Sequence, residues 1–382
     1  MKIVQINTFP HKAPGTIMMD IHKELLKKGN QSYVVWGRGR DPENEYEIYM
    51  NDKIGVYFHG IYTRITDKTG FASKKATKKL LKKLDEIKPD IIHLHNIHGY
   101  YINIEMLFNY IKNHKIKVVW TFHDCWPFTG HCPYFTFIDC NKWQSKCHNC
   151  PQINKYPKSF KDNSKWNYDN KKRLFTGIDM TIVTPSRWLA TLVKKSFLKN
   201  NNLKIINNGI NTEIFKPRKS DFRKVYNIEN KKIVLGVASE WTERKGLKDF
   251  IELSKLIDES VKIVLIGLKS NQIKKMPKNI LCLERLGNPE KLAEIYSAAD
   301  IFFNPTYEDN YPTVNLEASA CGTTVITYDS GGSAETTNSI VINSYNEILP
   351  YINNSSNAKV KKIKNKVDVA NNYIEVYEEL LK

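Results

Sequence analysis

The sequence predicts an α/β protein made of two doubly wound, Rossmann-like domains. Two separate series of short, β-branched apolar runs alternate with amphipathic helical patterns, which is typical of parallel sheets flanked by helices. A length of 382 residues allows two to three domains of ordinary size. Hydrophobic residues at 41% and charged residues at 26% exclude wholesale disorder and fibrous repeats.

The first domain is predicted over residues 1–190. It opens with a buried strand at 2–6 and a helix over 17–30 that Gly29 ends. Further strands are predicted from SYVVWG, DIIHLHN, IKVVWTFHD and DMTIVTPS, with a helix over residues 73–88 between the first two of them. Residues 125–165 are rich in cysteine and aromatic residues without a period, so we interpret them as an insertion.

The second domain is predicted over residues 191–365. Its strands are KIVLGVAS, KIVLIGL, NILCLER, IFFNP and TTVITYD, and its helices are GLKDFIELSKLIDES, PEKLAEIYSAA and PTVNLEASACG. A Lys- and Asn-rich stretch near 353–365 precedes a last helix over 366–382, which we expect to pack back toward the first domain. Two such domains place the carboxyl ends of their strands, and thus their ligand sites, around a shared cleft.

The chain is expected to carry neither a signal peptide nor a membrane-spanning helix. The start, MKIVQINTFPHK, lacks the apolar core of a signal peptide, and no later run approaches the length of a membrane-spanning helix. A reducing compartment is therefore expected for the seven cysteines, and the cytoplasm is the predicted location.

The segment from residue 301 to 336 predicts an anion site. A strand ends at Pro305, Pro312 suits the first turn of a helix, and Gly322 follows its end. The amides at Thr313 and Val314 then present a helix N-terminus suited to a diphosphate. Glu317, one turn later, can accept two ribose hydroxyls, and Asp309 can accept hydroxyls of a sugar; a capping loop with a solvated glutamate is the alternative.

Several motifs together resemble a known family. DIIHLHN (90–96), WTFHD (120–124), VTPSRWLA (183–190), INNGINTEIFKP (206–217), ERKGL (243–247) and the acidic pair occur in the order and spacing of the retaining family 4 glycosyltransferases of GT-B fold. The chain is most similar to bacterial enzymes that build capsules, O-antigens and exopolysaccharides. The resemblance implies transfer of a sugar from a UDP- or GDP-sugar to a surface-glycan acceptor, expected to be lipid-linked.

The resemblance also implies roles for single residues. Lys245 matches the lysine that neutralises the donor phosphates. The family carries an arginine where this chain has Ser239; Arg244 is either its substitute or a solvated side chain at a helix start. Asp309 or the preceding Glu308 holds the sugar, and the adjacent Asn310 is expected to bind the donor as well. His123 contacts the transferred sugar, although without the family it is as readily a core histidine. Gly15 keeps one glycine of the family's phosphate loop, predicted between the first strand and the first helix.

Four cysteines cluster inside the insertion. Cys147 and Cys150 form a CxxC, and Cys132 and Cys140 lie just upstream. A structural zinc site fits four thiolates in a segment without a periodic core; buried free thiols and a disulfide remain alternatives. No cofactor is expected for catalysis itself, because lysine and backbone dipoles neutralise the leaving diphosphate.

The net charge of +18 calls for anionic partners. Only nine of the 58 basic residues are Arg, which disfavours reading of nucleic-acid bases, so no nucleic-acid partner is expected. The helix over 73–88 carries a run of lysines: Lys74, Lys75, Lys78, Lys79, Lys82 and Lys83. These lysines form either the solvent-exposed face of a helix that packs on the core or a contact for an anionic membrane. An epimerase or phosphorylase on the same scaffold, and a nucleic-acid-binding protein, are the competing functional hypotheses.

Overall fold

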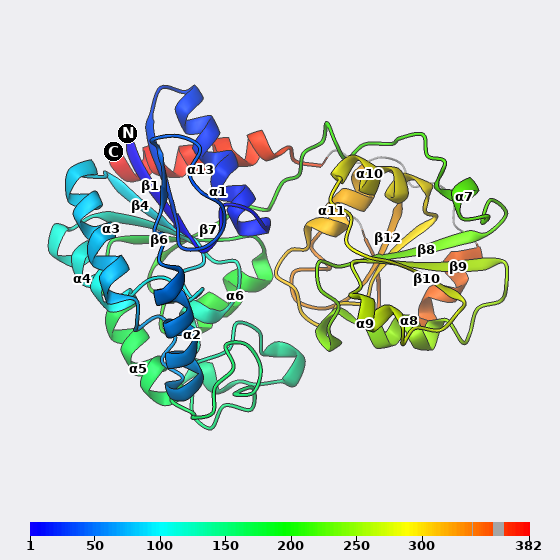
Figure 1. Ribbon diagram of the computed structural model, residues 1–382, viewed down its shortest axis with the longest axis horizontal. Helices are drawn as coiled ribbons and strands as arrows, with labels where there is room; N and C mark the ends of the chain where they lie inside the picture. Colours follow the sequence, from blue (N-terminus) through cyan, green and yellow to red (C-terminus); the bar gives the residue numbers. More distant parts are fainter. Residues whose placement is uncertain (338, 354–362) are drawn as a thin grey trace. The chain divides into compact units, whose positions relative to one another are not determined.

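The chain folds into two compact units. A computed structural model describes residues 1–337, 339–353 and 363–382. One unit comprises Met1–Asn207 with Val367–Lys382, and the other Asn208–Lys366 (Figure 1). The first unit extends beyond the expected boundary at residue 190 because a further strand, Asn202–Ile205, pairs with Met180–Thr184. Most of the Lys- and Asn-rich stretch expected at 353–365 lies outside the described residues.

The first unit contains a parallel sheet of seven strands in the order β3-β2-β1-β4-β5-β6-β7. The predicted strands are all present, and β3 and β7 are added at the two edges. The bounds are β1 Lys2–Asn7, β2 Gln31–Trp36, β3 Glu47–Tyr49, β4 Ile91–Leu94, β5 Lys117–Thr121, β6 Met180–Thr184 and β7 Asn202–Ile205. The order reverses between β1 and β4, so a ligand crevice is expected at their carboxyl ends.

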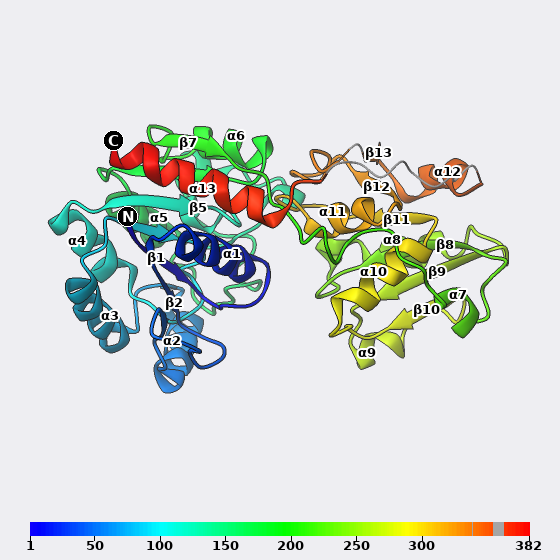
Figure 2. The ribbon, with the colours of Figure 1, turned by 90° about the horizontal axis from the view of Figure 1, so that it is seen from above.

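The helices of this unit cover both faces of the sheet. They are α1 Ala13–Lys27, α2 Lys53–Thr66, α3 Lys74–Ile87, α4 Ile104–His114, α5 Ser164–Phe175, α6 Arg187–Lys195 and α13 Lys366–Leu381. α13 packs beside α1 on one face, where Tyr377 donates to or accepts from His93 Nδ1 at 2.6 Å (Figure 2). α13 therefore belongs to the core of the first unit.

Gly15 does not lie in the loop where the sequence placed it. α1 begins at Ala13, so Gly15 belongs to its first turn. A Cβ at this position would stand 2.3 Å from the Phe9 carbonyl oxygen. Glycine is needed because the helix start approaches the preceding backbone that closely.

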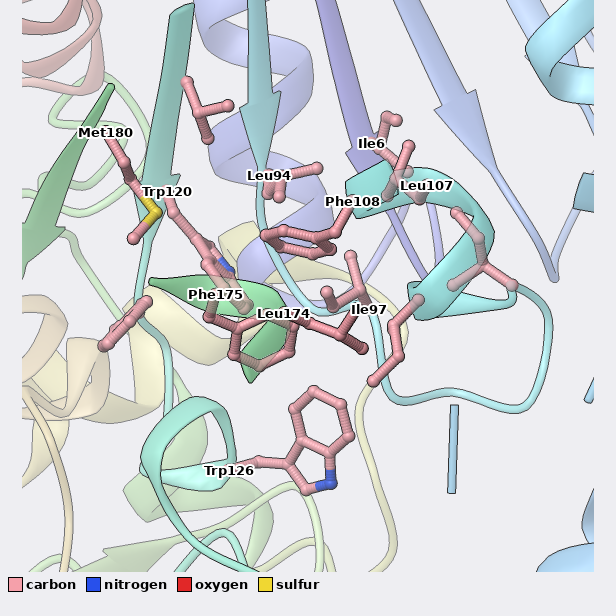
Figure 3. Close-up of a cluster of buried hydrophobic side chains, with 14 of the residues drawn as sticks. Ile6, Leu94, Ile97, Leu107, Phe108, Trp120, Trp126, Leu174, Phe175 and Met180 are labelled. Carbon is pink, nitrogen blue, oxygen red and sulfur yellow. The ribbon is translucent and has the colours of Figure 1, made fainter. Parts of the chain in front are cut away.

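The insertion packs on the main core through aromatic residues. Between β5 and α5 the described chain forms three one-turn helices, Trp126–Phe128, Thr136–Ile138 and Lys142–Gln144. Phe128 and Phe135 pack on Trp143 with ring centroids 5.2 and 4.9 Å apart. Trp126 lies against the cluster that holds Leu174 and Phe175 (Figure 3).

The second unit contains a parallel sheet in the order β10-β9-β8-β11-β12-β13. Its strands are β8 Lys232–Val237, β9 Val261–Ile266, β10 Ile280–Leu283, β11 Ile301–Asn304, β12 Thr324–Tyr328 and β13 Ile340–Ile342. Its helices are α7 Phe222–Val225, α8 Leu247–Leu253, α9 Ser270–Ile273, α10 Pro289–Ala298, α11 Thr313–Ala320 and α12 Leu349–Asn353, with single turns at Glu243–Lys245 and Tyr345–Ile348. α10 and α11 cover one face and α8 the other (Figure 1).

In the second unit α8 is shorter than predicted, and two loops that carry sequence motifs lie side by side. α8 ends at Leu253, earlier than the expected residue 260, and the Ser254 hydroxyl donates back to the Ile251 carbonyl at its end. The strand order reverses between β8 and β11. The loops after these two strands, which carry the ERKG motif and the acidic pair, therefore leave the same edge of the sheet side by side.

Candidate active site

Lys245 and Asp309 meet at the switch point of the second sheet. Lys245 follows β8 and Asp309 follows β11, and the Lys245 Nζ donates to Asp309 Oδ2 in an ion pair. About a fifth of each side chain is exposed, 19% and 18%. Burial alone would raise the pKa of Asp309, but Lys245 and Arg244 outweigh it and hold that pKa below its usual value. The pair is thus a charged group at the rim of the sheet.

Arg244 connects the loop after β8 to the loop after β11 by hydrogen bonds. Its guanidinium donates to the Glu308 carbonyl, and its own carbonyl accepts from the Tyr307 amide at 2.8 Å. The Thr306 hydroxyl also donates to the Arg244 and Glu308 carbonyls, at 3.3 and 3.2 Å. Glu308 is fully buried, so Asp309 is the carboxylate that lies beside Lys245 near the surface.

Gly331 and Gly332 pack against the backbone of the loop that carries Asp309. The Gly332 amide donates to the Asp309 carbonyl at 2.8 Å. Gly331 has φ +59°, and a Cβ there would lie 2.1 Å from the same carbonyl oxygen. Glycine is needed at position 331 because the backbone there approaches the loop that carries Asp309 so closely.

The start of α11 lies on the same edge. Pro312 is the N-cap, and its side chain makes no capping hydrogen bond; Asn310, two residues earlier, is buried. The first amides at Thr313 and Val314 give this end a partial positive charge. The predicted anion site and Lys245 therefore belong to one region of the second unit.

Glu317 lies one turn into α11 as a half-buried carboxyl group. The Tyr296 hydroxyl donates to its Oε2 at 3.2 Å. Burial raises the pKa of Glu317 to about 7, and the hydrogen bonds from Tyr296 and Thr313 offset only part of that effect. Its protonation near neutral pH makes it sensitive to a ligand that needs the carboxylate form.

His123 follows β5 at the carboxyl edge of the first sheet. Its Nε2 is 3.0 Å from His95 Nδ1, and the two rings stack with centroids 5.3 Å apart. Burial lowers the pKa of His123 to about 4, against the opposing effect of Asp124. The imidazole is therefore neutral at physiological pH and suited to hydrogen bonding rather than to charge neutralisation.

A further histidine at this edge was not anticipated. His98 Nε2 is 2.9 Å from Asp124 Oδ2 and its Nδ1 is 3.0 Å from the Tyr156 hydroxyl. The second oxygen of Asp124 accepts from the Trp126 amide at 2.9 Å and so caps the start of the following loop. His98 lies just beyond DIIHLHN, and no spacing in the sequence links it to Tyr156.

His98 and Tyr156 line a pocket at the switch point of the first sheet. The pocket is open to solvent and has about 760 Å³ of empty space; Gly15, Lys12 and Arg38 also line it. It collects hydrogen-bonding and cationic groups around the start of α1, in keeping with the crevice expected there.

The four clustered cysteines line one small pocket, which we call the cysteine pocket (Cys132, Cys140, Cys147 and Cys150). All four are free thiols, and the Gly130 amide donates to Cys147 Sγ at 3.2 Å. His131 also lines it; its Nδ1 is 2.5 Å from Asp67 Oδ1, and its buried Nε2 has no hydrogen-bond partner in the described part of the chain.

Such donors are those that zinc prefers, with Asp67 as the carboxylate that orients a ligating histidine. Within residues 1–337, 339–353 and 363–382, however, no group of three or more His, Cys, Asp or Glu is arranged to hold a metal ion. The structural zinc site stays a prediction.

Comparison with known families gives two adjoining matches. Residues 15–214 match Glycosyltransferase Family 4, and residues 218–366 match Glycosyl transferases group 1. A protein of Escherichia coli K12 that is named for a glycosyl transferase of colanic acid biosynthesis is 23% identical over 372 residues, 88% of this chain and 85% of its own. The Campylobacter jejuni N,N'-diacetylbacillosaminyl-diphospho-undecaprenol alpha-1,3-N-acetylgalactosaminyltransferase is 31% identical over 157 residues, 38% of this chain and 41% of its own.

Solved structures share the fold over the whole chain. Sucrose-phosphate synthase from Thermosynechococcus elongatus has a TM-score of 0.73 at 15% identity, covering 100% of this chain and 99% of its own. Anabaena Alr3699/HepE in complex with UDP-glucose has a TM-score of 0.67 at 14% identity, covering 99% and 100%. The expected GT-B fold, with two Rossmann-like parallel-sheet domains, is confirmed.

Proposed function

The chain belongs to Glycosyltransferase Family 4 and is a glycosyltransferase, and on this premise we propose that it moves a sugar from a UDP- or GDP-sugar to a lipid-linked bacterial surface glycan. The names of the E. coli and C. jejuni relatives, with colanic acid and a diphospho-undecaprenol, support this class of acceptor. The complex of the Anabaena protein with UDP-glucose supports the class of donor. Retention of the anomeric configuration follows the family resemblance.

The observation that carries the proposal is the Lys245–Asp309 pair beside the start of α11. A diphosphate bound there would take Lys245 from Asp309 and leave the Asp309 carboxylate for hydroxyls of the sugar. The bond from the anomeric carbon to the diphosphate breaks, the acceptor oxygen bonds that carbon, and the acceptor proton leaves with the diphosphate. Lys245 and the helix dipole stabilise the charge that develops on the leaving group.

The remaining candidates act on binding. Glu317 accepts hydroxyls of the ribose, and Arg244, Glu308 and Asn310 shape the loop that carries Asp309. His123, kept neutral by burial, donates or accepts one hydrogen bond to the transferred sugar.

No divalent cation is needed in this scheme, because Lys245 and the α11 amides supply the positive charge that a cation supplies elsewhere. Turnover in excess EDTA should equal turnover with added Mg²⁺; a strict requirement for Mg²⁺ would contradict it. We place the enzyme in the cytoplasm, at the inner face of the membrane. No described helix is long and apolar enough to cross a bilayer.

A thermal-shift panel tests the donor site. UDP, GDP, ADP and their sugars are each added at about 100 times Kd, where a specific ligand stabilises the folded state by about 2.7 kcal/mol. That corresponds to a rise in Tm of about 5 to 10 °C for a domain of this size. Glu317→Ala should lose the shift, and Glu259→Ala, which removes an exposed carboxylate elsewhere in the same unit, should keep it. No shift with any nucleotide would refute the proposed function.

A further inference from the structure

The outer face of α2 is apolar and uncovered. Five of its large side chains share one helical face at spacings of three and four residues, and all are exposed: Ile54 by 72%, Tyr57 by 68%, Phe58 by 61%, Ile61 by 38% and Ile65 by 58%. The opposite face is anchored, with His59 and Thr63 buried and His59 Nδ1 2.8 Å from the Ser73 hydroxyl. The helix is therefore held in place with its apolar side turned to solvent.

The insertion extends this apolar face. Phe160 is 77% exposed, and its amide donates to the Arg64 carbonyl at the end of α2 at 2.8 Å. We call these six side chains, Phe160 and the five of α2, the α2 surface. Such a concentration of exposed large apolar side chains is uncommon on a protein surface and marks an interaction site.

Cations surround the α2 surface. A wide groove with about 1600 Å³ of empty space lies between α2 and residues 154–160. Four side chains of the α2 surface line it (Tyr57, Ile61, Ile65 and Phe160), together with the cations Arg38, Lys53, Arg64, Lys155 and Lys158. No Asp or Glu is among the described residues that line it. The guanidinium of Arg64 lies 5.6 Å from the ring centroid of Phe160, so charge and apolar surface adjoin directly.

The charges decide between occupants. A second copy of the chain, docked through the same surface, would bring this set of cations against its own image without any carboxylate to pair with. A bilayer with anionic lipids instead offers phosphates at the level of the cations and hydrocarbon at the level of the apolar side chains.

We propose that the α2 surface docks the protein on an anionic lipid bilayer. Apolar side chains such as Tyr57, Phe58 and Phe160 enter the boundary between headgroups and acyl chains, and the lysines and arginines contact lipid phosphates. The lysine run on α3 does not offer the same contact, because the apolar residues of α3, among them Leu80 and Leu84, are buried in the core.

The groove leads to the candidate site of the first unit. It shares Arg38 and Tyr156 with the pocket that Gly15 and His98 line at the carboxyl ends of the strands. An acceptor carried by a lipid can therefore pass from the bilayer to this pocket along one surface. In this respect alone the inference rests on the proposed function; the docking itself does not depend on it.

Vesicle co-sedimentation of the full chain tests the docking. Wild type should bind vesicles of phosphatidylcholine with phosphatidylglycerol, and should bind vesicles of phosphatidylcholine alone far less. The triple variant Tyr57→Ser, Phe58→Ser, Phe160→Ser should lower the partition coefficient between vesicles and water about 100-fold or more. Each of the three substitutions removes an apolar side chain that would insert into the bilayer. Val225→Ser with Leu256→Ser, which removes exposed apolar side chains of the second unit, should change nothing.

Charge is tested by a matched pair of variants. Lys155→Ser with Lys158→Ser should weaken binding about 30-fold, whereas Lys78→Ser with Lys79→Ser on α3 removes the same charge and should have little effect. Equal losses in both, or wild-type binding by the triple variant, would overturn the proposal, as would a concentration-dependent dimer that the triple variant abolishes.

The nucleotide-induced rise in Tm separates the two proposals. The variants should keep it, which also shows that they are folded. Its absence in wild type that still binds vesicles would refute the donor site and leave the docking intact. Its presence in wild type that does not bind anionic vesicles would overturn the docking and leave the donor site intact.

Discussion

The pKa of Glu317 provides a sharp test of the donor site. Burial raises that pKa to about 7, so the group changes charge within the range in which the enzyme can be assayed. A carboxylate accepts both ribose hydroxyls, whereas its protonated form loses part of that capacity. Affinity for a nucleotide sugar should therefore rise as the pH rises through 7.

The size of the effect follows from the fraction ionised. With a pKa of about 7, about one tenth of Glu317 is ionised at pH 6 and about nine tenths at pH 8. If only the carboxylate form binds, the apparent Kd should fall about tenfold between these two values, which is about 1.4 kcal/mol. His123 does not contribute, because its pKa of about 4 lies below this range.

Isothermal titration calorimetry between pH 6 and pH 8 measures the apparent Kd of the nucleotide sugar that raises the Tm of the protein most. A nucleotide sugar is preferable to a free nucleotide because both of its phosphates are esterified on two sides and keep their charge over the range. Repeating the titration at pH 6 in buffers with different ionisation enthalpies should show release of about one proton per ligand bound. Glu317→Gln should bind with a Kd that is independent of pH.

Two results would refute the reasoning. A wild-type Kd that stays constant from pH 6 to pH 8 would show that Glu317 either does not titrate there or does not touch the ligand. The same slope in Glu317→Gln would assign the titration to another group. The stability of the free protein offers a separate check: the folded state keeps the proton up to about pH 7 and the unfolded state only to about 4.5, so this contribution is full below 4.5 and lost as pH rises through 7.

Three further outcomes are expected. Lys245→Ala should lower kcat/KM by about 10² to 10³ in initial-rate assays, with partial recovery in Lys245→Arg. Unchanged turnover in Lys245→Ala would show that Lys245 does not stabilise the leaving diphosphate. Gly331→Ala should cost about 1 to 3 kcal/mol in urea unfolding, because φ is +59° and the Cβ meets the Asp309 carbonyl. Gly177→Ala, with φ +71° and open space, should cost less. Purified protein should carry about one zinc ion per chain by elemental analysis, lost in Cys132→Ser; four reactive thiols without metal would contradict the zinc site.

Much of the fold is readable from short stretches of the chain. β-branched apolar runs such as those of β1 and β8 form buried strands because a strand covered on both faces must be apolar throughout. Pro312 and Gly322 mark the two ends of α11 because one lacks an amide that the first turn leaves unpaired and the other suits the residues past a helix end. The same local logic placed Lys245 and Asp309 among phosphate- and sugar-binding candidates.

The arrangement of these candidates was not readable in the same way. Lys245 and Asp309 are separated by β9 and β10 in sequence, and they pair only because β11 is added beside β8 in the sheet. The contact of Gly331 with the Asp309 loop depends on the same strand order. Gly15 was misplaced because its reason to be glycine is the backbone of Phe9, which the local pattern does not reveal.

The sequence alone therefore determined the two α/β domains, the family and the residue types of the candidate site. Tertiary structure decided which of those residues meet, and whether an apolar face is covered. α2 illustrates the difference: its apolar residues recur every three to four positions, the same period as in a core helix, yet Tyr57 and Phe58 face solvent. Periodicity reports on which side of a helix the apolar groups lie, whereas coverage of that side depends on elements far away in the chain.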